Sequence, residues 1–116
     1  MNTETKIQRE IQAAVSRGSA RLFRNSVGFD KANRVHYGLC VGSSDLIGFK
    51  TRTITADDVG QRVAVFVALE VKTPTGRVSP DQKRFIEFVT AAGGIAGVVR
   101  SVSEAINLVD GNQRVE

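Results

Sequence analysis

The sequence has little of the chemistry on which many catalytic and metal sites depend. Its 116 residues include one cysteine, Cys40, and one histidine, His36. A disulfide within the chain and a zinc site built from several cysteines are therefore excluded. A metal site with two or more histidines is excluded for the same reason, and Ser-His-Asp chemistry would have to pass through His36. The catalytic groups that remain are carboxylates, lysine and serine, and a hard metal ion suits the carboxylates.

Long apolar runs and linker-like tracts are also missing. No stretch approaches the roughly 18 apolar residues that cross a bilayer. Hydrophobic residues make up 41% of the chain and charged residues 24%, as in ordinary globular domains. The first ten residues are polar and charged, so we expect no secretory signal. We therefore expect a single domain over residues 1–116 with no membrane partner.

Positive charge is concentrated in one segment. Lysine and arginine number 16 against 12 acidic residues, giving a net charge of +4. Between residues 17 and 34 there is one acid, Asp30, and the basic residues are Arg17, Arg21, Arg24, Lys31 and Arg34. Such a stretch favours a polyanion such as nucleic acid. A solvated basic surface remains the alternative.

Periodicity and turn signals predict the order α-β-β-β-α-β-α. A helix is expected over residues 3–17, and residues 27–38 are expected to form a loop because turn formers dominate them. Ser79-Pro80 begins the second helix, with Gln82 completing a capping box, and Gly93-Gly94 ends it. The remaining elements are strands over residues 20–26, 45–55, 62–72 and 95–100, and a helix over residues 104–109. The strand-helix-strand order implies a parallel crossover.

The strand over residues 62–72 is apolar on both faces for most of its length. This pattern predicts a central strand that is covered on both sides. Two charged residues, Glu70 and Lys72, then follow on one face, because residues i and i+2 of a strand point the same way. Burying these charges is costly unless they are paired or bind a metal.

A second carboxylate, Asp45, opens the preceding strand. If this strand pairs antiparallel with the Glu70 strand, Asp45 and Glu70 meet next to Lys72. Two carboxylates suit Mg²⁺, and the lysine suits a developing phosphate charge, so the set fits a phosphodiester hydrolase. Simpler readings stay open at this point: Glu70 and Lys72 as an exposed ion pair, Glu10 as a surface acid, and Gln82 as a capping residue.

Three motifs in this order resemble the virus-type replication-repair nuclease (VRR-NUC) family of the PD-(D/E)xK superfamily. They are Gly42-Ser43-Ser44-Asp45-Leu46-Ile47-Gly48, Leu69-Glu70-Val71-Lys72-Thr73, and Ser79-Pro80-Asp81-Gln82 followed by Phe85. The resemblance extends over about residues 4–109. The Asp45 motif lacks the proline of the superfamily name, as is usual in this family.

The resemblance implies a role for each matching residue. Glu10, Asp45 and Glu70 are the metal-binding set, Lys72 is catalytic, and Gln82 supports the site. We expect Asp45 and Glu70 to hold Mg²⁺ or Mn²⁺, with the Val71 carbonyl as a further ligand and Glu10 in the outer shell. The candidate DNA contacts, taken from the charge pattern, are Arg21, Arg24, Lys31, Arg34 and Arg77.

The resemblance also implies a fold and a substrate. We expect a restriction-endonuclease-like α/β domain in which helices flank a mixed central sheet. Stand-alone members come from bacteriophage and bacteria and resemble dimeric junction resolvases. We therefore expect a homodimeric endonuclease of branched DNA, foremost Holliday junctions, in the cytoplasm of a bacterial or phage-infected cell. Three alternatives remain: a nicking or flap nuclease, a non-catalytic nucleic-acid-binding module, and an interaction protein.

Overall fold

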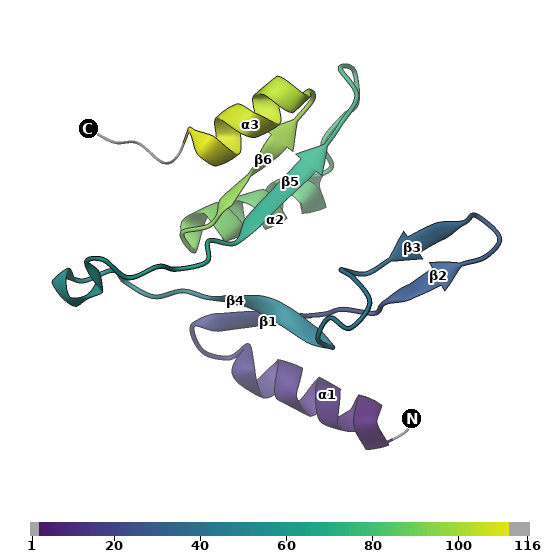
Figure 1. Cartoon of the computed structure of the whole chain (residues 1–116), viewed down its shortest axis with the longest axis vertical. Coiled ribbons are helices and arrows are strands. Elements are labelled where there is room, and N and C mark those ends of the chain that lie inside the picture. The colour runs from purple at the N-terminus through teal and green to yellow at the C-terminus, as the bar shows by residue number, and fades with distance from the viewer. Residues whose placement is uncertain (1–2, 112–116) are drawn as a thin grey trace. The chain divides into compact units, whose positions relative to one another are not determined.

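The computed structural model describes residues 3–111 and has the mixed α/β class that the sequence predicts (Figure 1). This composition of small sheets and helices is consistent with a restriction-endonuclease-like fold. The chain divides into two compact units, with the boundary between Thr53 and Ile54. The elements are α1 (Thr3–Val15), β1 (Ala20–Arg24), β2 (Gly28–Asp30), β3 (Val35–Tyr37), β4 (Leu46–Lys50), the 3-10 helix η1 (Ala56–Asp58), β5 (Val67–Val71), α2 (Pro80–Ala91), β6 (Ile95–Val99) and α3 (Val102–Asp110).

The first unit is built on the antiparallel pair β1–β4, in which Leu22 lies opposite Gly48. A Cβ atom at position 48 would lie 1.8 Å from the carbonyl oxygen of Arg21, so this close approach requires glycine. Helix α1 packs against β1, and two polar side chains, one from α1 and one from the turn that follows it, hydrogen-bond to the strand. Gln12 Nε2 donates to the Leu22 carbonyl at 3.1 Å, and the Leu22 N–H donates to Ser16 Oγ at 3.0 Å.

A hairpin, β2–β3, replaces the loop predicted over residues 27–38, and the predicted element order is wrong at this point. Each strand has three residues, too few for a periodicity signal, so the turn formers dominated the prediction. The Asp30 carboxylate organises the turn by accepting hydrogen bonds from Ala32 N, Asn33 N and Asn33 Nδ2 at 3.0, 3.4 and 2.8 Å. Arg34 completes the turn in the left-handed region, with φ 54°.

The second unit contains the parallel pair β5–β6 joined through α2, which confirms the predicted crossover. Helices α2 and α3 both pack against β6 (Figure 1). The capping box at Ser79 is also confirmed: Gln82 N donates to Ser79 Oγ at 3.1 Å, and Ser79 N donates to Gln82 Oε1 at 2.9 Å. Ser101 caps α3 by accepting from Glu104 N at 3.1 Å.

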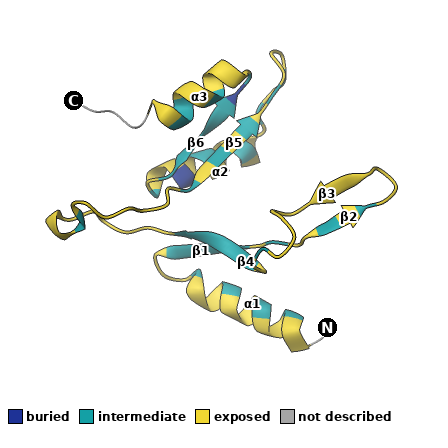
Figure 2. Ribbon diagram, viewed as in Figure 1, coloured by how far each residue is buried: buried dark blue, intermediate teal, exposed yellow. Residues whose placement is uncertain are grey.

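Burial is concentrated around β6, and among the described residues Val89 and Val99 alone are fully buried hydrophobics (Figure 2). Position 97 is a glycine that leaves room for α3, because a Cβ there would lie 2.8 Å from a Leu108 methyl carbon. Helix α3 thus packs on β6, and the β5 face carrying Val67, Leu69 and Val71 is exposed. Among the described residues of the second unit nothing covers that face, so the predicted cover on both sides of this strand stays a prediction.

The strands are shorter than predicted, and within residues 3–111 they form three two-stranded sheets: β1–β4, β2–β3 and β5–β6. The sequence predicted one mixed sheet. Strand β4 pairs with β1, and its predicted pairing with β5 stays a prediction because the two strands belong to different units. No helix in the described part of the chain is both long and apolar enough to cross a bilayer.

Candidate active site

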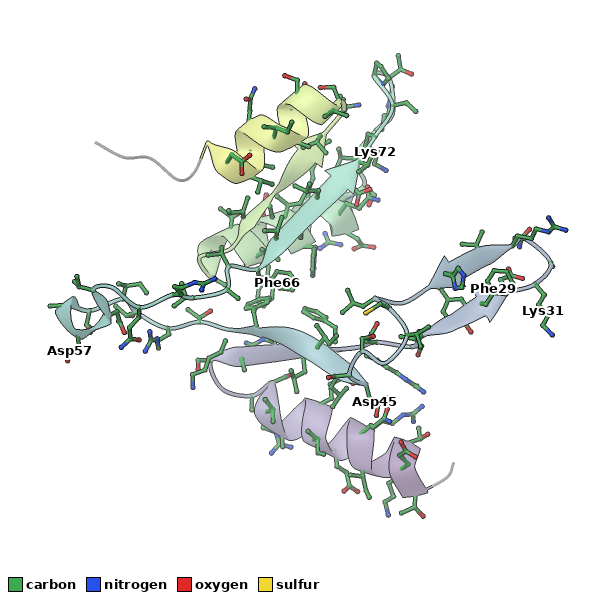
Figure 3. All side chains as sticks on the ribbon, viewed as in Figure 1. Phe29, Lys31, Asp45, Asp57, Phe66 and Lys72 are labelled. Carbon is green, nitrogen blue, oxygen red and sulfur yellow. The ribbon has the colours of Figure 1, made fainter. Side chains whose placement is uncertain are left out.

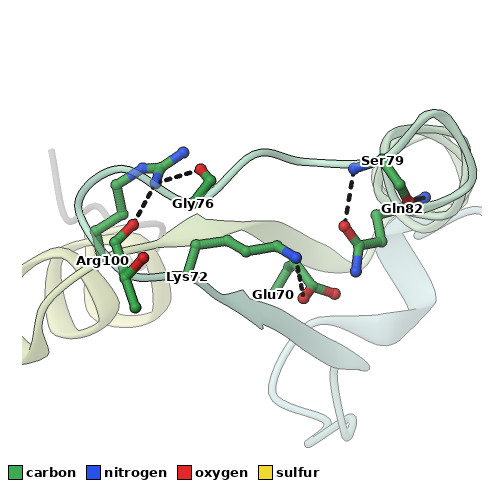
Figure 4. Close-up of polar contacts among 7 residues, drawn as sticks. Glu70, Lys72, Gly76, Ser79, Gln82 and Arg100 are labelled. Atoms are coloured by element: carbon green, nitrogen blue, oxygen red, sulfur yellow. Dashed lines mark hydrogen bonds and ion pairs between the residues drawn. The ribbon is translucent and has the colours of Figure 1, made fainter.

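The Glu70–Lys72 pair lies at the end of β5, with both side chains on one side of the strand as the spacing predicted (Figure 4). Lys72 Nζ lies 3.6 Å from Glu70 Oε2, and the two side chains are 21% and 31% exposed, respectively. Both charges are thus partly withdrawn from water. In such a partly buried place an ion pair interacts more strongly than on an open surface. Within the second unit, this pair brings a carboxylate and an ammonium group together in one partly buried place.

Gln82 lines the same hollow as Glu70. The hollow has a volume of about 310 Å³ and is lined by Ala68, Leu69, Glu70, Asp81, Gln82, Phe85 and Ile86. Because Gln82 Oε1 accepts from Ser79 N, the orientation of the side-chain amide is fixed. Its Nε2 group then remains as a donor, which suits an oxygen acceptor such as a carboxylate or a phosphate. Gln82 therefore serves as the capping residue and also lines the site (Figure 4).

Arg100 holds the turn that follows Lys72, and the sequence analysis assigned it no role. Its Nη1 donates to the carbonyls of Thr73 at 2.6 Å and Gly76 at 2.8 Å. The turn itself is closed by Gly76 N donating to Thr73 O at 3.0 Å, and Lys72 N donates to Val99 O at 3.1 Å. The topology could have indicated Arg100, because the carboxyl ends of neighbouring parallel strands meet at the same edge of a sheet. Arg100 follows β6 at that edge as Lys72 follows β5.

We expect the Arg100→Ala variant to lose about tenfold in kcat with little change in KM. Two charge-assisted hydrogen bonds to the turn disappear, and misplacement of Lys72, the predicted catalytic group, should lower the rate more than it lowers binding. Arg100→Lys should recover part of kcat, since lysine keeps the charge but not the fork of donors. Steady-state kinetics of the predicted DNA cleavage measure the separate effects on kcat and KM. Arg84→Ala is the control, because its ion pair with Asp81 is exposed and contributes little stability. Equal losses of kcat in Arg100→Ala and Arg84→Ala would contradict this positioning role.

Asp45 is held in the first unit by a polar network centred on Asn25, another residue that the sequence analysis missed. Asn25 N donates to the Asp45 carbonyl at 2.8 Å. Asn25 Nδ2 donates to Ser43 Oγ at 2.7 Å and to the Ser44 carbonyl at 2.9 Å. Asn25 Oδ1 accepts from Leu39 N at 3.1 Å. The Gly-Ser-Ser turn that carries Asp45 is therefore fixed by one amide side chain from the end of β1.

The structure places the predicted site residues in two groups. Glu70, Lys72 and Gln82 come together in the second unit. Glu10, on α1, and Asp45, just before β4, are exposed residues of the first unit. The meeting of these two groups stays a prediction.

The donor set fits a hard divalent ion. Within either unit, the described residues contain no cluster of three or more histidine, cysteine, aspartate or glutamate side chains. Mg²⁺ needs fewer, since it takes one or two protein carboxylates and keeps several waters. Glu70 supplies one half-buried carboxylate at the end of β5, and the adjacent Val71 carbonyl supplies a second oxygen type that such ions accept. These residues would hold the ion in the second unit, and Asp45 is the predicted further carboxylate.

The predicted DNA contacts differ in how their side chains are engaged. Arg21 Nη1 donates to the carbonyls of Gly18 at 2.6 Å and Ala20 at 2.7 Å, so part of its guanidinium stabilises the strand start. Arg24, Lys31, Arg34 and Arg77 are exposed. Their charges are thus accessible to a polyanion, and DNA contact by all five residues stays a prediction.

Comparison with known proteins identifies a family. A sequence model described as the VRR-NUC domain matches residues 3–103 of the chain. The match includes the three motifs and every predicted metal-site residue. No curated protein matches the chain, and no solved structure does.

Proposed function

The chain belongs to the VRR-NUC domain family, whose members are nucleases that act on DNA, and from this premise we propose a metal-dependent endonuclease of branched DNA. The observation that carries the proposal is the half-buried Glu70–Lys72 pair beside the oriented amide of Gln82. An isolated exposed ion pair would need neither partial burial nor a neighbouring donor of fixed orientation. The chemistry of these groups matches what phosphodiester hydrolysis requires.

Asp45, Glu70 and the Val71 carbonyl are proposed to hold Mg²⁺ or Mn²⁺, with Glu10 in the outer shell. When bound, the ion polarises the scissile phosphate and lowers the pKa of a water. The Glu70 carboxylate extends from the end of β5. This strand is hydrogen-bonded to β6 along its length, so a rigid element presents the ligand.

Lys72 is proposed to orient the attacking water and to offset the charge that develops on the phosphoryl oxygens. Its Nζ is held 3.6 Å from Glu70, so it is already directed toward the carboxylate that positions the reaction. Gln82 Nε2 donates to the phosphate or holds Lys72 in place, because its oxygen is committed to Ser79. The backbone of the turn that follows Lys72 is fixed by Arg100.

Four-way junctions are proposed as the substrate and a C2 homodimer as the active form. Resolving a junction requires two symmetric cuts, and this domain carries the residues for one active site. A two-fold dimer is the commonest way to supply two sites. It also sets two basic surfaces side by side, which suits the wide charged face of a branched substrate.

We expect the protein with Mg²⁺ to cleave a labelled four-way junction by paired cuts, at least tenfold faster than duplex, flap or single-stranded DNA of the same sequence. Product mapping on a denaturing gel measures this preference. Light scattering at micromolar protein, with and without junction DNA, measures the mass. A monomer in both conditions that still makes paired cuts would contradict the dimer, and preferred cleavage of flaps would favour a flap-directed or nicking nuclease.

A further inference from the structure

The β2–β3 hairpin is an exposed element that the proposed chemistry does not use. Phe29, Val35 and Tyr37 are 46%, 53% and 51% exposed. Figure 3 labels Phe29 and Lys31 on this hairpin. A two-stranded hairpin of such short strands is only marginally stable alone, and its exposed aromatic side chains offer ring faces that a partner could cover. The hairpin is therefore a candidate for contact with a partner.

The rings of the hairpin are held in defined positions. Phe29 lies directly opposite His36 in the register, and the two ring centroids are 4.6 Å apart. On the other face the Tyr37 ring covers Gly28, where a Cβ atom would lie 2.1 Å from the phenolic oxygen. Because strand residues alternate between faces, the ribbon presents aromatic groups on both sides.

The turn of the hairpin is positively charged. Lys31 and Arg34 are exposed there, and the carboxylate of Asp30 is engaged by the turn itself. The hydrogen bond from the Asn33 side chain, with those from the Asn33 and Ala32 backbone, lowers the pKa of Asp30. The contribution of Asp30 to the turn is therefore present at neutral pH and is lost only as the pH falls through this lowered pKa.

The hairpin ends a longer basic segment that begins at Arg17 and includes Arg21 and Arg24 of β1. Residues 17–38 contain five basic residues and one acid, and the net charge of the chain is +4, so the basic and acidic residues elsewhere balance. A partner that is anionic and offers flat groups to the rings would complement this surface. Nucleotides with an unstacked base face combine both properties, because bases stack on aromatic side chains while phosphates bind lysine and arginine.

We propose that the β2–β3 hairpin binds the unstacked base faces at the branch point of DNA, with Phe29 stacking on a base and Lys31 and Arg34 contacting the adjacent phosphates. This inference rests on the proposed branched substrate and names the feature that distinguishes it from duplex. Within a duplex each base pair is stacked on both faces, whereas the base pairs that flank an open branch point expose one face.

The chain has no tryptophan, so a Phe29→Trp variant carries a single fluorescent probe at the hairpin. In EDTA, where metal-dependent cleavage is prevented, we expect a four-way junction to quench this fluorescence and matched duplex to leave it nearly unchanged. Val59→Trp is the control, because Val59 is 86% exposed in the other unit. Equal quenching by duplex, or no quenching by junction, would overturn the proposal.

Affinity measurements in EDTA provide a second readout. Phe29→Ala should weaken junction binding about tenfold and duplex binding less than twofold, as expected for the loss of one stacked base. Phe29→Leu keeps an apolar side chain without a π-face and should bind the junction as weakly as Phe29→Ala. Full binding by Phe29→Leu, equal loss on both DNAs, or a change in oligomeric mass with Phe29→Ala would each contradict base stacking.

The two proposals fail differently. If the wild-type protein binds junctions through Phe29 but cleaves no DNA with Mg²⁺ or Mn²⁺, the hairpin inference stands and the catalytic proposal is wrong. If it cleaves junctions with unchanged preference in Phe29→Ala, the catalytic proposal stands and the hairpin inference is wrong.

Discussion

Replacing Lys72 by methionine is expected to lower the rate of Mg²⁺-dependent cleavage by roughly a thousandfold, and Glu70→Gln should do the same. Methionine keeps much of the length and apolar contact of the lysine stem but removes the ammonium group that faces Glu70 at 3.6 Å. Binding should change less than about threefold, because affinity for DNA draws on many phosphate contacts. Single-turnover cleavage and gel-shift titration of the same preparations separate the two effects.

The matched control for lysine is Lys83→Met, since Lys83 is an exposed residue of α2. Cleavage by this variant should stay within about twofold of wild type, as for most surface substitutions. Full activity in Lys72→Met would mean that the proposed mechanism is wrong. A parallel loss of activity and DNA affinity in both Glu70→Gln and Lys72→Met would favour a binding module over an enzyme.

Asp45 and Glu70, which belong to different units, are proposed to bind one metal ion, and this shared site should be seen in the thermal stability of the protein. Mn²⁺ or Ca²⁺ at a hundredfold excess over Kd should stabilise the wild-type protein by about 2.7 kcal/mol, which corresponds to a rise in Tm of roughly 10 °C. Asp45→Asn and Glu70→Gln should each remove most of this shift. The double variant should lose no more than either single variant, because one shared ion is lost only once. Thermal melting with and without the ion measures all four proteins.

Asp57→Asn controls for the general effect of removing a carboxylate, since Asp57 is an exposed residue of η1. Its metal-dependent shift should equal that of wild type. If Asp45→Asn keeps the full shift while Glu70→Gln loses it, Asp45 and Glu70 do not hold the same ion. If no protein responds to either metal, Glu70 and Lys72 form a plain ion pair.

Sequence reasoning succeeded where local rules determine the structure. The capping box at Ser79 depends on residues three positions apart, and the shared face of Glu70 and Lys72 depends on residues two apart. Both features were predicted and both are present. The parallel crossover through α2 follows from element order alone.

The missed features depend on contacts between distant parts of the chain. Asn25 reaches Leu39 and Ser44, and Arg100 reaches Thr73 and Gly76 across more than 20 residues. No spacing rule connects such positions before the fold is known. The β2–β3 hairpin was missed for a different reason, since its strands are three residues long and its turn is set by the single side chain of Asp30.

The bonds from α1 to β1 have a consequence for the solubility of the protein. Gln12 and Ser16, one helical turn apart, engage the carbonyl and N–H of Leu22, and Arg21 engages the carbonyl of Ala20. These side chains occupy the backbone groups of β1 that a foreign strand would otherwise use as a template. With these groups already bonded, a strand from another molecule would find few free hydrogen-bonding groups along this edge of β1.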